Sequence, residues 1–165
     1  MSRLSVVLPA YNEELMVGKT CRVLHEVLAE AGISYELVVV DDGSKDKTWE
    51  EITKAGEKDG NVLGVHFSRN FGKEAAVYAG MAQATGDVVA VMDCDLQHPP
   101  ETLISMYHLW EQGMGSNRRR KEIKRNGKSA SQRERWLFLW NHVQGYRCEY
   151  AECFGFQNDG QESSE

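Results

Sequence analysis

Four short apolar runs alternate with longer amphipathic stretches, and this alternation constrains the fold more than any other feature of the chain. The runs, rich in Val and Leu, cover residues 4–8, 37–40, 62–67 and 88–92. Stretches of helical length and periodicity cover residues 13–31, 46–58, 72–84 and 99–112. Strands joined by single helices form right-handed crossovers, so we expect an α/β fold with a mainly parallel, Rossmann-like sheet and helices on both faces.

Local signals support these boundaries. Gly32 follows the first amphipathic stretch, where a helix commonly ends in a left-handed residue. Asp46 or Thr48 can cap the second helix, and Pro9 is expected to end the first strand. Pro99 and Pro100 suit a helix N-terminus, since the N–H that proline lacks has no partner there.

Composition excludes several classes of protein. The formal net charge of −6 argues against a general nucleic-acid binder. No run approaches the ~18 apolar residues of a membrane span, so no transmembrane helix is expected in this chain. The four cysteines show neither CxxC nor zinc spacing, so we expect reduced thiols in a cytoplasmic protein.

The chain changes character near Gly113. Residues 1–113 carry 9 Lys and Arg against 18 Asp and Glu, whereas residues 114–165 carry 10 against 7. The second part holds the basic run RRRKEIKR, then the aromatic patch WLFLW, then a polar tail. We therefore divide the chain into residues 1–113 and a divergent basic tail, residues 114–165, and expect the ordered core to end near Gly113.

Polar residues follow each apolar run. In an open parallel sheet, ligands bind beyond the carboxyl ends of the strands. The segments concerned are PAYNEE, DDGS, SRNFGK and DCDLQH. Asp93 and Asp95 are expected on one side of an extended segment, where paired like charges are costly without a cation. Such a pair suits a hard divalent ion that also takes oxygens from a diphosphate.

These segments carry a family resemblance. VVLPAYNEE, VVVDDGSKDKT, SRNFGKEAAVYAG and GDVVAVMDCDLQHPPE, in this order, closely resemble the inverting family-two glycosyltransferases over residues 4–113. The nearest group is the polyprenyl-phosphate sugar transferases, which include dolichol-phosphate mannose synthase and bactoprenol glucosyltransferases. The resemblance implies a GT-A fold, a nucleotide-diphosphate-sugar donor, a polyprenyl-phosphate acceptor and a Mg²⁺ or Mn²⁺ cofactor.

The resemblance also implies roles for residues. Asp93 and Asp95 match the catalytic and metal-binding pair, which also meets the donor's ribose and diphosphate. Arg69 and Lys73 lie in a stretch near the donor, and Gln97 matches a residue beside the donor sugar. Either Asp41 or Asp42 matches the acidic residue at the base or ribose. The segment that holds base and ribose is matched by Pro9, Ala10, Tyr11 and Glu13.

The implied reaction is a direct displacement with inversion at the anomeric carbon. A lipid phosphate is already ionised at pH 7, so it needs little help from a general base. The acceptor would place the enzyme at the cytoplasmic face of the membrane. The sequence sets neither the donor sugar nor the oligomeric state, although a homo-oligomer is compatible with it. Two alternatives are a non-catalytic nucleotide-sugar-binding remnant and a nucleotidyltransferase, which would favour a Gly-rich basic loop where PAYNEE stands.

Residues 114–165 depart from the family pattern. Reading the implied codons one base later, with permissible choices, turns MGSNRRRK into WEVIEGVK, which resembles the family's own continuation. The same shift forces Gly at Trp136 and Trp140. We therefore predict a frameshift near Gly113, with a natural basic, membrane-facing tail as the alternative.

Overall fold

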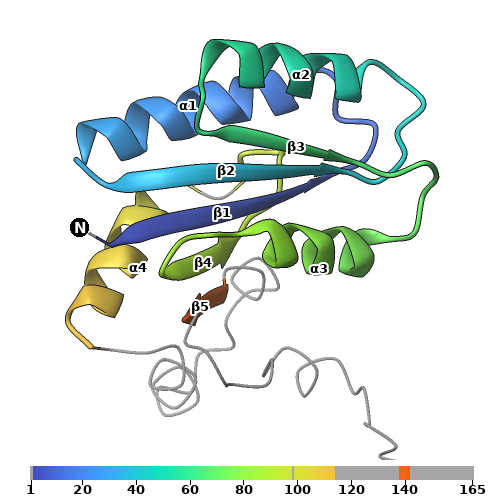
Figure 1. Cartoon of the computed structure of the whole chain (residues 1–165). Helices are drawn as coiled ribbons and strands as arrows, with labels where there is room; N and C mark the ends of the chain where they lie inside the picture. Colours follow the sequence, from blue (N-terminus) through green and yellow to red (C-terminus); the bar gives the residue numbers. More distant parts are fainter. Residues whose placement is uncertain (1, 98, 114–137, 142–165) are drawn as a thin grey trace, which may run out of the picture.

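The computed structural model describes residues 2–97, 99–113 and 138–141, the last as a backbone strand only. Its sheet has five strands in the order β3-β2-β1-β4-β5 (Figure 1). Strands β1 to β4 are parallel and β5 is antiparallel to β4, which confirms the predicted mainly parallel sheet. The strands are Arg3–Ala10, Ser34–Asp41, Val62–His66, Val88–Val91 and Phe138–Asn141.

Three of the described helices connect the parallel strands and a fourth follows β4, and together they cover both faces of the sheet, as predicted. They are α1 (Val17–Glu30), α2 (Thr48–Lys58), α3 (Lys73–Gln83) and α4 (Glu101–Glu111). Figure 1 shows α1 and α2 on one face and α3 on the other. Leu103 of α4 belongs to the same buried cluster as Leu24 of α1, whereas α3 packs Val77 against Val7 and Val38 in a second cluster.

The two clusters follow from the sheet's pleat. Successive residues of a strand face opposite sides, so Val6 of β1 lies in the cluster with α1 and Val7 lies in the cluster with α3. Both residues are fully buried. This burial on both faces explains why the strands have continuous apolar sequences instead of alternating ones.

Two predicted boundaries need correction. Strand β1 continues through Pro9 to Ala10, whose carbonyl accepts the Asp42 N–H at 2.9 Å. Helix α1 begins at Val17 rather than near Glu13, because residues 14–16 form a turn in which the Glu13 carbonyl accepts the N–H groups of Met16 and Val17. Gly32 ends α1 in the left-handed conformation, with φ of +67°, as expected.

The sheet continues beyond Gly113. Phe138–Asn141 forms β5, which pairs with β4 from Val88 to Val91. Strand β4 would otherwise be an open edge with unpaired backbone groups, and an aromatic run of high β-propensity suits that edge. The rest of residues 114–165 lies outside the described residues. Among the helices that are described, none is both long and apolar enough to cross a bilayer.

Candidate functional site

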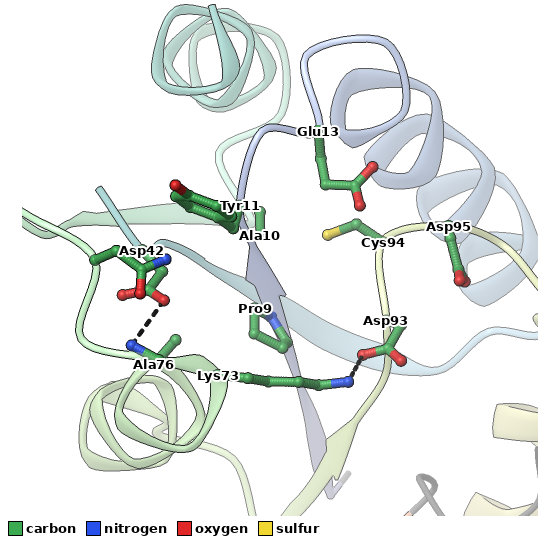
Figure 2. A pocket seen from close by; sticks show the side chains of 12 residues that line it. Pro9, Ala10, Tyr11, Glu13, Asp42, Lys73, Ala76, Asp93, Cys94 and Asp95 are labelled. Atoms are coloured by element: carbon green, nitrogen blue, oxygen red, sulfur yellow. Dashed lines mark hydrogen bonds and ion pairs between the residues drawn. The ribbon is translucent and has the colours of Figure 1, made fainter. Parts of the chain in front are cut away.

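A cavity of about 310 Å³ lies at the carboxyl ends of β1, β2 and β4, beside the first turn of α3 (Figure 2). These ends meet at one edge because the register pairs Ala10 with Asp41 across β1 and β2. In Figure 2, Tyr11 and Asp42 lie on one side of the cavity, and Glu13, Asp93 and Asp95 lie on the other. The lining residues are Pro9, Ala10, Tyr11, Glu13, Asp42, Asn70, Gly72, Lys73, Ala76, Asp93, Cys94 and Asp95.

Hydrogen bonds hold the loop after β1 against the loop before α2. The Asn12 N–H donates to Ser44 Oγ at 2.9 Å, and the Lys45 N–H donates to Asn12 Oδ1 at 3.0 Å. The Glu13 N–H donates to Thr48 Oγ1 at 2.7 Å. Asn12 has a φ of 54°, a left-handed conformation that Asn tolerates better than most residues. The polar residues of PAYNEE and DDGSKDKT therefore fix the loop after β1, which carries Tyr11 on one side of the cavity and Glu13 on the other.

Glu14 takes part in the same contact. Its carboxylate accepts the Lys47 N–H at 2.9 Å, and its own N–H donates to Asp46 Oδ2 at 3.2 Å. It does not line the cavity. Its contacts therefore give Glu14 a structural role.

Asp41 and Asp42, which the sequence left as alternatives, have different surroundings. Asp42 lines the cavity and is 2% exposed, and its carboxylate accepts the N–H groups of Phe71 at 2.7 Å and Gly72 at 3.0 Å. Asp41 is fully buried and lies 2.8 Å from His66 Nδ1. The structure therefore brings Asp42, and not Asp41, to the cavity.

A close backbone approach brings the loop after β3 up to Asp42. Gly43 has a φ of +68°, and a Cβ there would lie 2.3 Å from the carbonyl carbon of Arg69. Only glycine fits this position without moving backbone. The contact holds Asn70 and Gly72 at the cavity, so the SRNFGK segment forms its third wall.

The acidic side of the cavity is formed by Glu13, Asp93 and Asp95. Burial raises the pKa of the Glu13 carboxyl, and the charges of Asp95, Asp46 and Asp93 raise it further. Lys73 crosses from α3 to this side, with its Nζ 2.6 Å from Asp93 Oδ1. The carboxylates are therefore close enough to repel one another, and one lysine offsets part of their charge.

The segment that carries Asp93 and Asp95 is a turn and not the extended segment expected from the sequence. Leu96 has a φ of 53°, and the Gln97 N–H donates to Asp95 Oδ1 at 3.0 Å. Cys94 between them is 2% exposed, and its carbonyl accepts the Thr20 hydroxyl at 2.6 Å. Both residues nevertheless line the cavity.

These residues fit a divalent cation only in part. Oxygen ligands suit Mg²⁺ and Mn²⁺, and the mutual repulsion of Glu13, Asp93 and Asp95 favours a cation. Among the described residues, however, no group of three or more His, Cys, Asp or Glu side chains is arranged to hold a metal. The donor set therefore fits an ion that is held by one or two carboxylates and completed by phosphate oxygens.

Two further predicted site residues lie outside the cavity lining. Arg69 has its guanidinium 4.8 Å from the centre of the Phe71 ring. Gln97 contributes its backbone N–H to Asp95 and does not line the cavity. Both remain near it in sequence and in space, since Arg69 contacts Gly43 and Gln97 contacts Asp95.

Sequence reasoning missed four lining residues. Asn70, Gly72 and Ala76 fall within SRNFGKEAA, where only the cations were selected as candidates. Cys94 is the middle residue of the D-x-D pair, and burial raises the pKa of its thiol well above the usual value. These residues could have been found from the sequence, because each lies in a segment that follows a strand end. Cys21 and Cys94, the two described cysteines, are free thiols, as expected.

Comparison with known proteins gives a consistent result. The family model described as "Glycosyl transferase family 2" matches residues 5–158, a range that runs past Gly113. An uncharacterized glycosyltransferase, YkcC of Bacillus subtilis (strain 168), is 43% identical over 109 residues, covering 66% of this chain and 34% of YkcC. An undecaprenyl-phosphate 4-deoxy-4-formamido-L-arabinose transferase of Pseudomonas aeruginosa (strain LESB58) is 42% identical over 110 residues, covering 66% of this chain and 32% of that protein. The chain thus spans about a third of the length of these relatives.

Solved structures show the same likeness. TarS 1–349 of S. aureus in complex with UDP is 28% identical, with a TM-score of 0.54, and the match covers 67% of this chain and 32% of that one. Mannosyl-3-phosphoglycerate synthase of Rubrobacter xylanophilus, at 23% identity and a TM-score of 0.51, shares the fold over 59% of this chain and 32% of that one.

Proposed function

The chain belongs to glycosyl transferase family 2, and on this premise we propose that residues 2–113 form the donor-binding part of an inverting glycosyltransferase with a polyprenyl-phosphate acceptor. The GT-A fold implied by the motifs is confirmed by the likeness to TarS. The division at Gly113 stays a prediction, since the family match runs across it.

The observation that carries the proposal is the cavity where Tyr11, Asp42, Asp93 and Asp95 converge from three strand ends. It lies where an open parallel sheet binds nucleotides. The solved relative TarS binds UDP, and the arabinose transferase relative is named for undecaprenyl phosphate. These names support a nucleotide-sugar donor and a polyprenyl-phosphate acceptor for this chain.

We assign the nucleoside end of the donor to the side with Tyr11 and Asp42. The Tyr11 side chain is 42% exposed and can stack on a base, with Pro9 and Ala10 as neighbouring backbone. Asp42 is held by two backbone N–H groups, so its remaining lone pairs point in fixed directions toward a base or ribose donor. Asp41 is hydrogen-bonded to His66 and stabilises the end of β2 instead.

We assign the diphosphate end to the side with Glu13, Lys73, Asp93 and Asp95. Asp93 and Asp95 would hold the divalent cation, which when bound neutralises charge on the departing nucleoside diphosphate. Lys73 offers an ammonium to a phosphate oxygen, and Arg69 and Gln97 lie on the loops next to the donor's phosphates and sugar.

The acceptor attacks the anomeric carbon from the face opposite the leaving diphosphate, which inverts the configuration there. Because the protein binds both the nucleoside and the diphosphate of the donor, it keeps this face of the anomeric carbon turned toward the acceptor. The protein therefore accelerates the reaction mainly by orienting the two substrates. An ionised lipid phosphate is already a nucleophile at pH 7 and needs no strong base. A lipid acceptor implies action at the cytoplasmic face of the membrane.

Calorimetric titration tests the proposal. We expect UDP or GDP to bind with an affinity that rises at least about tenfold when Mn²⁺ is added, and Asp95→Asn to remove most of this rise. Loss of a charge-assisted contact costs about 1.5–3 kcal/mol, which corresponds to roughly a ten- to hundredfold change. Glu101→Gln, which removes an exposed carboxylate from α4, is the matched control. An unchanged Mn²⁺ dependence in Asp95→Asn would refute the metal assignment.

A further inference from the structure

Lys73 is the one cationic side chain among the described residues that line the cavity. Four acidic residues line the same cavity, and they are Glu13, Asp42, Asp93 and Asp95. Figure 2 shows its side chain extended along the cavity to Asp93. The distance of 2.6 Å between Lys73 Nζ and Asp93 Oδ1 is that of a direct, charge-assisted hydrogen bond.

The pair joins two separate parts of the fold. Lys73 is the first residue of α3. Asp93 follows β4, the strand next to β1 in the sheet. Both side chains are partly exposed, at 41% and 27%, so solvent and ligands can reach them. The lysine side chain is a flexible stem of four carbons, so its ammonium can leave Asp93 without any movement of α3.

Asp93 therefore has two competing cations. In the free protein its carboxylate is bound to an ammonium, whereas the proposed function needs it beside a divalent ion. An ammonium and a divalent cation on one carboxylate repel each other. Lys73 thus opposes metal binding at Asp93 for as long as its ammonium stays there.

Resting on the proposed donor site, we propose that Lys73 takes the place of the divalent cation on Asp93 in the free protein and moves to the donor's diphosphate when donor and metal bind. Gly72 and Ala76, which flank Lys73 on the first turn of α3, also line the cavity. The released ammonium consequently stays within the same cavity, where the diphosphate supplies new oxygen partners. Lys73 thereby keeps metal binding weak until a donor is present.

The exchange couples the two ligands. The metal must displace Lys73 from Asp93 whether or not a donor is present, and the diphosphate adds charged oxygen atoms to which the displaced ammonium can bind. By linkage, the donor strengthens metal binding by the same factor as the metal strengthens donor binding. Part of this coupling comes from Lys73 and should disappear with it.

The test measures Mn²⁺ binding in the absence of nucleotide, by electron paramagnetic resonance of the free ion. Lys73→Met should bind Mn²⁺ roughly three- to tenfold more tightly than the natural protein, because a screened like charge has been removed. With UDP present, the enhancement of Mn²⁺ affinity by UDP should fall by a similar factor in Lys73→Met. Lys58→Met, at the exposed far end of α2, removes the same charge and should change neither value more than twofold.

Lys73→Gln provides a second variant in case Lys73→Met does not fold. A measurement on the natural protein is also decisive: the ¹⁵N signal of the Lys73 ammonium should shift when Mg²⁺ and UDP are added together. An Mn²⁺ affinity that is unchanged in both variants, or an unmoved ammonium signal, would overturn the exchange. If the natural protein binds neither Mn²⁺ nor UDP, the proposed function fails instead, so the two failures are distinguishable.

Discussion

At the residue scale, the neighbours Asp41 and Asp42 show how one step along the chain changes the task of a carboxylate. Asp41 is the last residue of β2 and lies against His66, whose ring also stacks on Trp49 with centroids 4.8 Å apart. Asp42 accepts two backbone N–H groups from the loop after β3 and lines the cavity. One carboxylate therefore stabilises the strand end, and the other is available to a ligand.

Glu36 is a buried carboxylate at the opposite end of the sheet. It accepts the Ser5 hydroxyl at 2.5 Å and the Thr85 N–H at 2.6 Å, and it lies 3.4 Å from an Arg3 guanidinium nitrogen. Burial alone would raise the pKa of Glu36, but the hydrogen bonds from Ser5 and Thr85 and the charge of Arg3 together lower it below its ordinary 4.5. The folded state therefore favours the ionised form.

We expect Glu36→Gln to lower the free energy of unfolding at pH 7 by about 1–3 kcal/mol, because Ser5 and Thr85 lose a charged acceptor. The sign of the pH effect follows from the lowered pKa. The stability due to Glu36 is present above the unfolded pKa and is lost as pH falls from 4.5 through the folded pKa. Urea unfolding at pH 7 and below pH 4.5 measures how much the free energy of unfolding falls in acid. This fall should be smaller in Glu36→Gln than in the natural protein.

The exposed carboxylate Glu30 at the end of α1 gives a control, and Glu30→Gln should leave the free energy of unfolding within about 0.5 kcal/mol at pH 7. If the free energy of unfolding fell equally in acid for Glu36→Gln and the natural protein, the ionised Glu36 would not stabilise the fold.

At the scale of elements, α3 approaches the sheet closely at Gly80. A Cβ at Gly80 would lie 2.3 Å from Val7 Cγ1 and 3.2 Å from Val40 Cγ2. Both valines are fully buried and β-branched, so they cannot rotate away easily. The small residue therefore sets how near α3, and with it Lys73, lies to the end of β1.

We expect Gly80→Ala to destabilise the protein by about 1–3 kcal/mol, since overpacking outweighs the gain of up to about 1 kcal/mol from helix propensity. Gly18→Ala on α1 is the matched control, because its Cβ would meet only Glu51 Oε2 at 3.5 Å. That variant should stabilise the protein slightly, and urea unfolding measures both. Should Gly80→Ala stabilise the protein as much as Gly18→Ala, the close approach of α3 would be wrong.

At the scale of the whole molecule, the strands and helices were predictable because apolar periodicity and helix-end signals are local. The strand ends then indicated the segments of the site. What the sequence could not supply depends on contacts between distant segments. The loop before α1 contacts Thr48, the different surroundings of Asp41 and Asp42 depend on His66 and Gly72, and the Arg69 backbone lies against Gly43.

The predicted frameshift also concerns the whole molecule. The described part supplies the cavity at the ends of β1, β2 and β4, beside α3, and the pairwise matches to curated relatives cover about two thirds of the chain. The resemblance implies that an acceptor-facing acidic residue and an amphipathic helix follow residue 113 in the family. Apart from β5, residues 114–165 lie outside the described residues, and the family match extends into them as far as residue 158.

We expect the chain with its present sequence to bind a nucleoside diphosphate and to transfer little or no sugar to a lipid phosphate. Donor binding needs only the loops after β1 to β4, whereas transfer also needs the acceptor held opposite the leaving group. A one-base edit near the Gly113 codon that restores the shifted frame should leave UDP or GDP affinity within about threefold and raise transfer to polyprenyl phosphate by at least about a hundredfold, since effective molarities of positioned groups are large. The comparison assays both proteins with the same panel of nucleotide-sugar donors, and a synonymous edit at the same codon serves as the control. Full activity of the unedited chain, or no gain after the edit, would show that residues 114–165 are a genuine part of the enzyme.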